Sequence, residues 1–499
     1  MTTNSFAYLV FVGFVFITFY LVKGKYRWSL LLLASLIFYA SQKAPHLLLA
    51  LALVILVSYY WGLRLKAAKK DRKKQLWLLS GILLNLVFLF LFRYLPAIVS
   101  TTPSLSSNPN WSFLSGLLTV GISFFVLQAI SYLIDIYLEV LEPERHLGTF
   151  ALYLSFFPKL IQGPIERGSD LLPQLHRPYQ FDYQNMRRGL WQIEQGLFKK
   201  LVIADRLAIF VNAVYNNVQT YTGIPLIIAT YLYALQIYFD FSAYTDIALG
   251  VARLFGINLT QNFNSPYLAD SIPEFWRRWH ISFSRWILDY IFKPLQMFMR
   301  EWKQWGSAIA LIITFLLSGI WHGMAWGFIV WGLLHGIYMA ASVFFSPFFK
   351  KLFKRLKLEK NNILKVAQVF ITFNLVSFTW IFFRAKTLTD AIYVVTHLLR
   401  GIGSSLRQLL RSLIPQVNIS GLTKFIQPYL LGQDNKSILI LVCVLAVALL
   451  AAIINARSKK KEFPLDQSTF IRWGIYYLLV FAILFLGVFN SYQFIYNQF

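Results

Sequence analysis

The amino-acid sequence predicts an all-α integral membrane protein, and three observations carry that prediction. Hydrophobic residues make up 57% of the 499 residues, and the mean hydropathy is +0.56. Charged residues make up only 14%, whereas soluble proteins carry about 25%. Apolar runs of about 20 residues, the length of a membrane-spanning helix, recur along the chain. We expect one polytopic domain over residues 1–499 with about eleven membrane segments.

Charge clusters set the expected topology. Seven basic residues lie between Arg64 and Lys74, six between Lys350 and Lys360, and four between Arg457 and Lys461. Loops rich in Lys and Arg are cytoplasmic under the positive-inside rule, which places both termini outside. Because the net charge of +26 is confined to such clusters, we do not expect a nucleic-acid partner; the partner implied is membrane lipid.

The expected spans follow from the apolar runs between these clusters. The first is retained as a helix because its basic residues follow the run, whereas a signal peptide carries them in front. Two loops without dense basic clusters are expected outside, Ser100–Trp111 and Leu398–Asp434. In chain order the spans with stated bounds are Phe6–Val22, Trp28–Ser41, His46–Leu63, Leu76–Leu95, Ser112–Leu138, Leu364–Phe383, Ser437–Ile454 and Ile471–Val488. Between the fifth and the sixth, the stretches Ala308–Leu317 and Phe328–Phe345 are almost wholly hydrophobic.

Two middle stretches, Leu152–Pro178 and Thr260–Gly306, lack the pattern of a membrane-spanning helix. They mix apolar residues with Pro, Gly and charged residues, and their apolar runs are too short to cross a bilayer. Irregular backbone at membrane depth is tolerated only inside protein or beside a water-filled cavity. We therefore expect re-entrant or interfacial helices that line a cavity.

His322 is the first candidate for chemistry. It lies between glycines and tryptophans in Ser318–Gly327, inside an apolar stretch. About 16 residues of helix separate it from Gly306, or roughly 24 Å, which places it within the bilayer. Ionisable groups there are costly and imidazole suits a general base, so we predict that His322 is the catalytic base. For His335 a structural role is favoured, and His46, His146, His176 and His397 are expected in loops or interfaces.

The cluster Glu274–Ser282 interleaves aromatic and basic side chains. It fits either an interfacial helix with an aromatic belt or a funnel wall that binds an anionic donor through Arg277, Arg278 and Trp279. Asp240, Tyr244 and Asp246 add polar groups to an apolar helix, and one of the aspartates is a candidate partner for those arginines. The lone cysteine, Cys443, is expected to be a small buried residue.

Four stretches together resemble the membrane-bound O-acyltransferase family. They are Phe156–Ile165, Tyr238–Asp246, Asn262–Tyr267 running on to Glu274–Ser282, and Gly319–Gly323. The likeness is nearest to the bacterial branch of alginate O-acetylation and teichoic acid D-alanylation, and it is strongest over residues 1–390. The chain departs from the alginate-type pattern at Ile291–Arg300, where such members carry a Gly-Gly-Asn-Arg turn. Nothing comparable is recognised in the C-terminal helices expected within 436–490.

The resemblance implies a ring of helices around a central tunnel, in a bacterial cytoplasmic membrane. It implies that His322 matches the invariant histidine of the family and that His280 matches a second conserved polar position. It also implies a cytoplasmic thioester donor and an external partner that completes transfer to a polysaccharide.

The mechanism expected is acyl transfer from acetyl-coenzyme A, or from an acyl carrier protein, to a surface polysaccharide. His322 would take the proton of the acceptor hydroxyl, with His280 at the oxyanion or the donor. Arg277, Arg278 and Lys293 would contact donor phosphate, and Asp240, Tyr244, Trp279 and Trp321 would line the substrate path. No metal or tightly bound cofactor is expected. The alternatives are D-alanyl transfer, a transporter or flippase, and a non-catalytic scaffold.

Overall fold

The computed structural model describes residues 1–42, 44–358, 361–403, 437, 439–446, 464–489 and 494, and these residues form helices without any strand. Seven described helices are long and apolar enough to cross a membrane, and α1 and α8 are shorter apolar helices. The longer elements are α1 (Phe6–Leu21), α2 (Arg27–Ala40), α3 (Pro45–Ala67), α4 (Asp71–Leu89), α8 (Ile122–Tyr137), α11 (Tyr183–Phe198), α12 (Asp205–Tyr215), α13 (Ile224–Leu254), α17 (Lys303–His322), α18 (Trp326–Arg355), α19 (Asn362–Arg384), α20 (Leu388–His397) and α24 (Thr469–Leu486). The all-helical membrane architecture expected from the sequence is thus confirmed.

Short helices fill the middle of the chain. They are α5 (Leu95–Thr101), α6 (Pro103–Ser106), α7 (Pro109–Ser112), α9 (Leu147–Ser155), α10 (Gly168–His176), α14 (Ile272–Arg278), α15 (Ile281–Ile287) and α16 (Lys293–Phe298), with 3₁₀ turns η1 (Gly24–Tyr26), η3 (Phe113–Leu117), η5 (Val218–Thr220), η6 (Pro266–Leu268) and η8 (Arg300–Trp302). Residues 156–167, between α9 and α10, are not helical and are almost all buried. Both middle stretches thus consist of short helices and buried irregular backbone.

Three long helical stretches each contain a π-helical segment. Segment η2 (Phe90–Tyr94) joins α4 to α5, η4 (Lys199–Ala204) joins α11 to α12, and η7 (Leu288–Phe292) joins α15 to α16. A π segment inserts an extra residue into a helix and is often found at functional sites. Each of the three carries charged side chains whose partners are described below.

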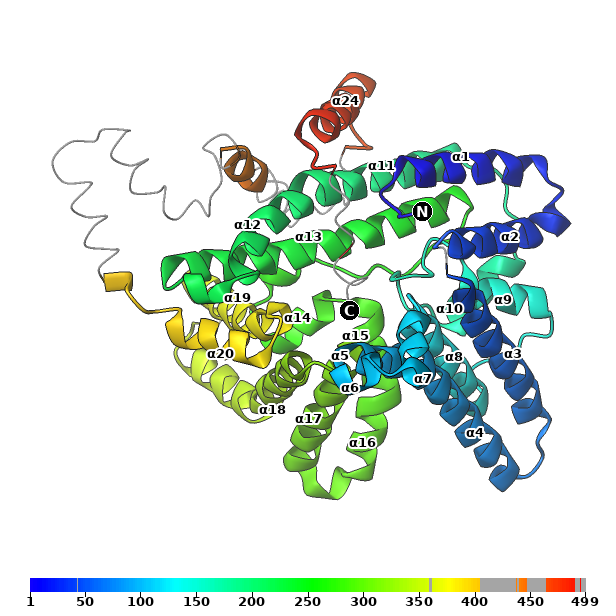
Figure 1. Ribbon diagram of the computed structural model, residues 1–499, viewed down its shortest axis with the longest axis horizontal. Coiled ribbons are helices and arrows are strands. Elements are labelled where there is room, and N and C mark those ends of the chain that lie inside the picture. Colours follow the sequence, from blue (N-terminus) through cyan, green and yellow to red (C-terminus); the bar gives the residue numbers. More distant parts are fainter. Residues whose placement is uncertain are drawn as a thin grey trace.

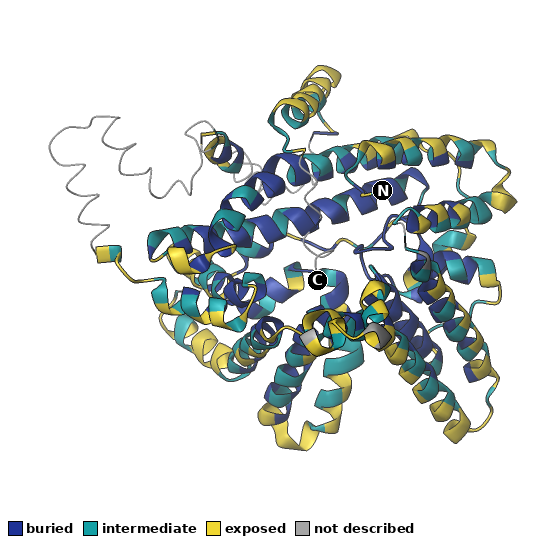
Figure 2. Cartoon of the chain, in the orientation of Figure 1, coloured by how far each residue is buried: buried dark blue, intermediate teal, exposed yellow. Residues whose placement is uncertain are grey.

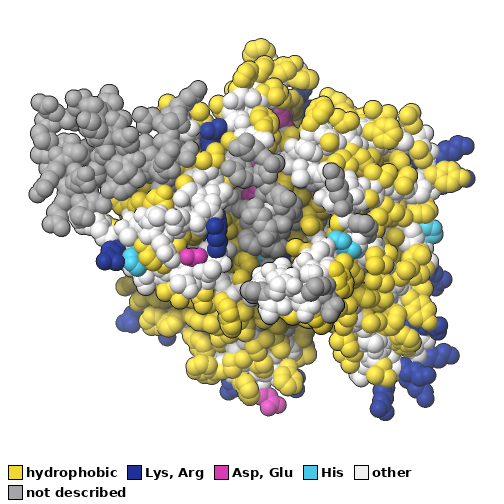
Figure 3. All heavy atoms as spheres, viewed as in Figure 1, with side chains coloured by type: hydrophobic (Ala, Val, Ile, Leu, Met, Phe, Trp, Pro, Cys, Tyr) yellow, Lys and Arg dark blue, Asp and Glu magenta, His cyan; other side chains and the backbone are white. Residues whose placement is uncertain are grey.

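The buried core lies in the middle of the molecule, where Figure 2 shows dark blue along α13, α8 and the short helices. In Figure 1, α11 and α13 run side by side, and the hairpins α3–α4 and α16–α17 reach the lower edge. The basic side chains at the α3–α4 turn are exposed and gather at the lower right of Figure 3, and hydrophobic side chains cover much of the visible face. An apolar surface of this extent fits contact with lipid tails.

Helices α17 and α18 pack closely because glycines face across them. A Cβ on Gly319 would lie 2.4 Å from the carbonyl oxygen of Phe328, and one on Gly332 would lie 2.4 Å from that of Phe315. Small residues let two membrane helices approach backbone to backbone. This seam fixes the end of α17, where His322 lies, against the first turns of α18.

Several expected boundaries are wrong. Within the predicted span Ser112–Leu138 the long α-helix begins only at Ile122, because the short 3₁₀ helix η3 and Gly121, with φ +83°, come before it. The predicted loop Ser100–Trp111 contains α6 and most of α7. Cys443 is exposed rather than buried, since it lies on an apolar surface. Half of Ser437–Ile454, most of the loop Leu398–Asp434 and all of Arg457–Lys461 lie outside the described residues.

Candidate active site

His322 is the last residue of α17 and is only 3% exposed. Aromatic rings enclose its imidazole, with ring centroids 4.8 Å away at Trp321, 5.0 Å at Trp331 and 5.2 Å at Phe383. Gly323 follows with extended backbone (φ 166°, ψ 171°), which ends the helix. The histidine therefore lies at a helix break deep in the protein, as the sequence predicts.

His280 lies at the junction of α14 and α15, where its backbone is left-handed (φ 42°, ψ 56°). A non-glycine residue in this conformation is strained and is retained when its surroundings enforce it. Asn262 holds the backbone next to His280 in this conformation. Its carbonyl accepts from the Ile281 N–H at 2.9 Å, and its Oδ1 accepts from the Ser282 N–H at 3.1 Å.

The two histidines lie on either side of the same aromatic pair. The Phe283 ring is 5.2 Å from the His280 ring and 6.0 Å from the His322 ring, and it stacks on Trp321 at 4.4 Å. His280 lies outside the spanning helices, and burial lowers its pKa to about 3, so its imidazole is neutral at pH 7 and can donate one hydrogen bond. The structure thus brings together the two residues expected to be catalytic.

Trp321 contributes a hydrogen-bond donor to this region. Its indole Nε1–H is buried and has no hydrogen-bond partner among the described residues. Its ring lies between the two imidazoles, 4.8 Å from His322 and 6.4 Å from His280. A buried donor left unsatisfied by the protein is a place for a substrate oxygen or for water. This arrangement agrees with the expected role of Trp321 on the substrate path.

His335 is fully buried and both of its ring nitrogens are used. Its Nδ1 accepts from the Trp276 indole at 3.2 Å, and its Nε2 lies 2.9 Å from the Thr379 hydroxyl, which donates to the Val376 carbonyl at 2.7 Å. Since Nδ1 accepts, Nε2 carries the proton and donates to Thr379. This series of hydrogen bonds gives His335 a structural role, which is the role favoured from the sequence.

The basic candidates for donor phosphate are all ion-paired. Arg277 and Arg278 both contact Glu274, at 2.9 and 2.7 Å, and Lys293 contacts Asp289 at 2.6 Å. The side chains of Arg277 and Lys293 remain 73% and 59% exposed, so both are accessible to an anion. Trp279 is 1% exposed and packs among Phe263, Phe275, Tyr267 and Trp380, which indicates core packing for its ring.

The hypothesis that Asp240 or Asp246 pairs with Arg277 or Arg278 is wrong. Lys200 contacts Asp240 at 2.7 Å and Asp205 at 2.8 Å, and the neighbouring Lys199 contacts Asp246 at 2.6 Å. Both lysines belong to η4, and adjacent residues of a helix point to different sides. They therefore meet two aspartates that are six residues apart on α13. Close by, Tyr244 is 1% exposed and its hydroxyl points to the Pro158 carbonyl at 3.4 Å.

Two further buried ionisable residues, Lys159 and Glu166, lie within the motif Phe156–Ile165 and just after it. Lys159 is 0% exposed and donates to Gln128, and Glu166 accepts from the Thr260 N–H at 2.5 Å and from its hydroxyl at 3.0 Å. Burial lowers the pKa of Lys159 and raises that of Glu166. No role was predicted for either residue, although a lysine within an apolar run is itself a signal of special chemistry.

Arg93 is another residue that the sequence analysis passed over. It lies in η2 and its guanidinium reaches the end of α17, where it donates to the His322 carbonyl at 2.9 Å. An arginine inside the run Leu89–Leu95 could have been recognised by the cost of placing a charge in a membrane segment.

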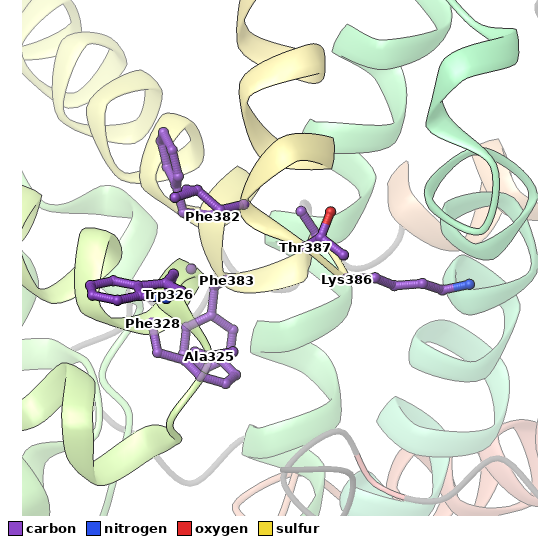
Figure 4. Close-up of a pocket in the computed structure, with 10 residues that line it drawn as sticks. Ala325, Trp326, Phe328, Phe382, Phe383, Lys386 and Thr387 are labelled. Atoms are coloured by element: carbon purple, nitrogen blue, oxygen red, sulfur yellow. The ribbon is translucent and has the colours of Figure 1, made fainter. Parts of the chain in front are cut away.

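A cavity of about 220 Å³ lies between the start of α18 and the turn from α19 to α20 (Figure 4). Phe328 and Phe383, which contact the His322 ring, also line this cavity, and Trp326, Lys386 and Thr387 form other parts of its wall. No group of three or more His, Cys, Asp or Glu side chains able to hold a metal occurs in the part of the chain that the structure describes.

Comparison of the sequence with known proteins points to one family. Residues 34–383 match the family described as MBOAT, membrane-bound O-acyltransferase family. The peptidoglycan O-acetyltransferase of Helicobacter pylori is 31% identical over 95% of this chain and 92% of its own. The Pseudomonas aeruginosa protein named probable alginate O-acetylase AlgI is 35% identical over 78% of this chain and 73% of its own. The teichoic acid D-alanyltransferase of Bacillus subtilis is 27% identical over 67% and 82%.

The match covers α3–α19 and therefore includes both histidines and the elements that hold them. An all-helical membrane fold, a buried histidine at a helix break and similarity along nearly the whole chain agree with one another. The chain belongs to the membrane-bound O-acyltransferase family and is an O-acyltransferase.

Proposed function

We propose that the protein moves an acetyl group from a cytoplasmic thioester, such as acetyl-coenzyme A, to a hydroxyl of a cell-surface polysaccharide outside a bacterial cytoplasmic membrane. The observation that carries the proposal is the placement of His322 and His280 around Trp321 and Phe283. The basic turns at Arg64–Lys74 and at Lys350–Lys360 support a cytoplasmic location for these loops and an external location for both termini.

In this mechanism His322 accepts the proton of the acceptor hydroxyl as its oxygen attacks the thioester carbonyl. The carbonyl oxygen becomes an oxyanion, to which the Trp321 indole N–H donates. The neutral His280, on the other side of Phe283, binds the same oxyanion or orients the donor. The C–S bond then breaks, the ester forms, and His322 returns the proton to the departing thiolate. Atoms and charges balance without a metal or a redox group.

The two substrates reach His322 from opposite ends. Helix α17 begins at Lys303, close to the basic residues Lys293 and Arg300, which are expected in the cytoplasm. The donor therefore enters beside α16, where Lys293 is an exposed phosphate contact, and Arg277 is a second. The cavity at the opposite end of α17, beside Trp326, is the approach for the acceptor.

The share of each chain that aligns with its relative favours acetyl transfer over D-alanyl transfer. The Helicobacter peptidoglycan O-acetyltransferase aligns along nearly the whole of both chains, whereas the Bacillus D-alanyltransferase aligns with two thirds of this one. On the same ground peptidoglycan is the first acceptor to test and alginate the second. We propose that an external partner protein receives or completes the transfer, as expected for this branch.

The test is acyl transfer by the purified protein in lipid vesicles with radiolabelled acetyl-coenzyme A, repeated with extract that supplies carrier and partner proteins. The variants are His322→Ala and, as a matched control, His335→Gln, which changes a second buried histidine one helix later. We expect His322→Ala to abolish donor turnover and His335→Gln to retain it per folded molecule. Retained turnover in folded His322→Ala would refute the assigned base, and unchanged label crossing the bilayer would indicate a transporter.

A further inference from the structure

The last three carbonyl groups of α17 converge on two adjacent residues of η2. The Tyr94 hydroxyl donates to the Ile320 carbonyl at 3.1 Å. The Arg93 guanidinium donates through one nitrogen to the Trp321 carbonyl at 3.3 Å and to the His322 carbonyl at 2.9 Å. The same two residues of one segment thus hold the end of the helix that carries the proposed base.

These contacts satisfy a specific need. The last four carbonyls of an α-helix have no donor within the helix, and inside a membrane protein an unsatisfied carbonyl is costly. The Gly323 N–H donates to the Gly319 carbonyl at 3.3 Å, but Gly323 then leaves the helix in an extended conformation, so the three carbonyls after Gly319 take their donors from another segment. A cation at the negative end of the helix dipole is also favourable. Arg93 therefore acts as the cap of α17.

The other half of the guanidinium connects this cap to α8. Its Nη1 donates to the Ser123 hydroxyl of α8 at 2.6 Å. The backbone beside Arg93 is held as well, because the Phe92 carbonyl accepts from the N–H of Thr119, just before α8, at 2.8 Å. One residue further along α8, the Phe124 ring lies 5.6 Å from Trp321 and 6.4 Å from His280. The planar fork of arginine holds two partners in fixed geometry, which a lysine cannot do.

We propose that Arg93 is a positioning residue for the acyl transfer: its guanidinium fixes the end of α17, and hence the His322 ring, relative to α8 and His280. This inference rests on the proposed function, because it assumes that His322 is the base. A displacement of about 1 Å in a catalytic group costs roughly a hundredfold in rate. Arg93 has no proposed contact with donor or acceptor, so its loss should lower kcat while the KM for the donor changes little.

The chain offers a matched control in Arg206. Its guanidinium donates to the Leu486 carbonyl at 2.6 Å, so it too caps the C-terminal end of a helix, α24, but α24 carries no proposed catalytic residue. We would measure kcat, KM and thermal stability for Arg93→Lys, Arg93→Gln, Arg206→Lys and Arg206→Gln in lipid, beside His322→Ala. The expected kcat loss is about a hundredfold for Arg93→Gln and about tenfold for Arg93→Lys, with less than threefold for either Arg206 variant.

The result that overturns the inference is folded Arg93→Gln with kcat within threefold of wild type, or with a loss no larger than that of Arg206→Gln. A loss expressed only in KM would also overturn it, because that would make Arg93 a substrate-binding residue. His322→Ala keeps the two proposals distinct. If it is inactive while Arg93→Gln is fully active, the proposed function stands and the role of Arg93 falls. If His322→Ala is itself active, the proposed function falls.

Discussion

The buried cluster of Lys200, Asp205 and Asp240 tests how burial sets the loss of unfolding free energy when a charge is removed. Lys200 lies 2.7 Å from Asp240 and 2.8 Å from Asp205, and the three side chains are only 1–3% exposed. The ring of Phe494 covers the ammonium at 4.3 Å from its centroid. Replacing the lysine with methionine keeps most of the volume but leaves two carboxylates together without a cation.

Removing one partner of a buried ion pair costs roughly 3–5 kcal/mol, because the remaining charge is stranded in a medium of low polarity. We expect Lys200→Met to lose about that much free energy of unfolding. Lys66 is the control, since it pairs with Glu142 at 2.5 Å but the side chains are 48% and 74% exposed. Lys66→Met should change the free energy of unfolding far less than Lys200→Met does, as is usual for surface pairs.

The assay is unfolding by sodium dodecyl sulfate in mixed micelles, followed by tryptophan fluorescence. The triple variant Lys200→Met, Asp205→Asn, Asp240→Asn should recover most of the loss, since it removes the stranded charges with the lysine. Protonation would also neutralise a stranded carboxylate, so the cost of Lys200→Met should shrink from pH 8 to pH 5. A cost equal to that of Lys66→Met, or a triple variant no more stable than the single one, would refute the reasoning.

Three further predictions concern other parts of the molecule. His335→Leu leaves the buried Trp276 indole without an acceptor, whereas the Thr379 hydroxyl keeps its bond to the Val376 carbonyl. It should therefore cost about 1–3 kcal/mol of stability in the same unfolding assay, with kcat per folded molecule unchanged. Gly319→Ala puts a Cβ 2.4 Å from the Phe328 carbonyl and should separate α17 from α18, lowering both stability and acyl transfer, whereas Gly13→Ala, with nothing within 4 Å, should be silent in both assays. Burial raises the pKa of Glu194 from 4.5 to about 7, so its ionisation destabilises the fold as the pH rises between those values. Glu194→Gln should therefore raise the melting temperature at pH 8 and change it little at pH 4.5. An equal effect at both pH values would contradict this assignment.

Much of the architecture follows from composition and periodicity, because lipid contact demands long apolar helices whatever their neighbours are. The predicted runs at His46–Leu63, Leu76–Leu95 and Leu364–Phe383 each lie within a single long helical stretch of the structure. The predicted boundary at Ser112 failed because a left-handed glycine at position 121, next to buried backbone of another segment, decides where α8 begins. Such a contact joins residues far apart in sequence and leaves no periodic signal.

The candidate site was predictable only in part. His322 stands out because an imidazole in an apolar stretch has a free-energy cost that needs a reason, whereas the role of His280 came from the family resemblance. The partners of the charged residues did not stand out, since Asp240 meets a lysine forty positions away and Arg93 meets a carbonyl 229 positions away. Sequence spacing constrains neighbours within one helix but not the side chains that a second helix brings.

The sequence by itself determined that this chain is a membrane protein and which family it resembles, because both depend on local composition and short motifs. It also predicted which residues carry the chemistry. Only the tertiary structure decided that His322 ends its helix under an arginine cap, that His335 is closed into a hydrogen-bonded chain and that the arginines of α14 pair with Glu274. The physical reason is that a buried polar group must find its partner wherever the packing of helices puts one, and that choice is made in space rather than along the chain.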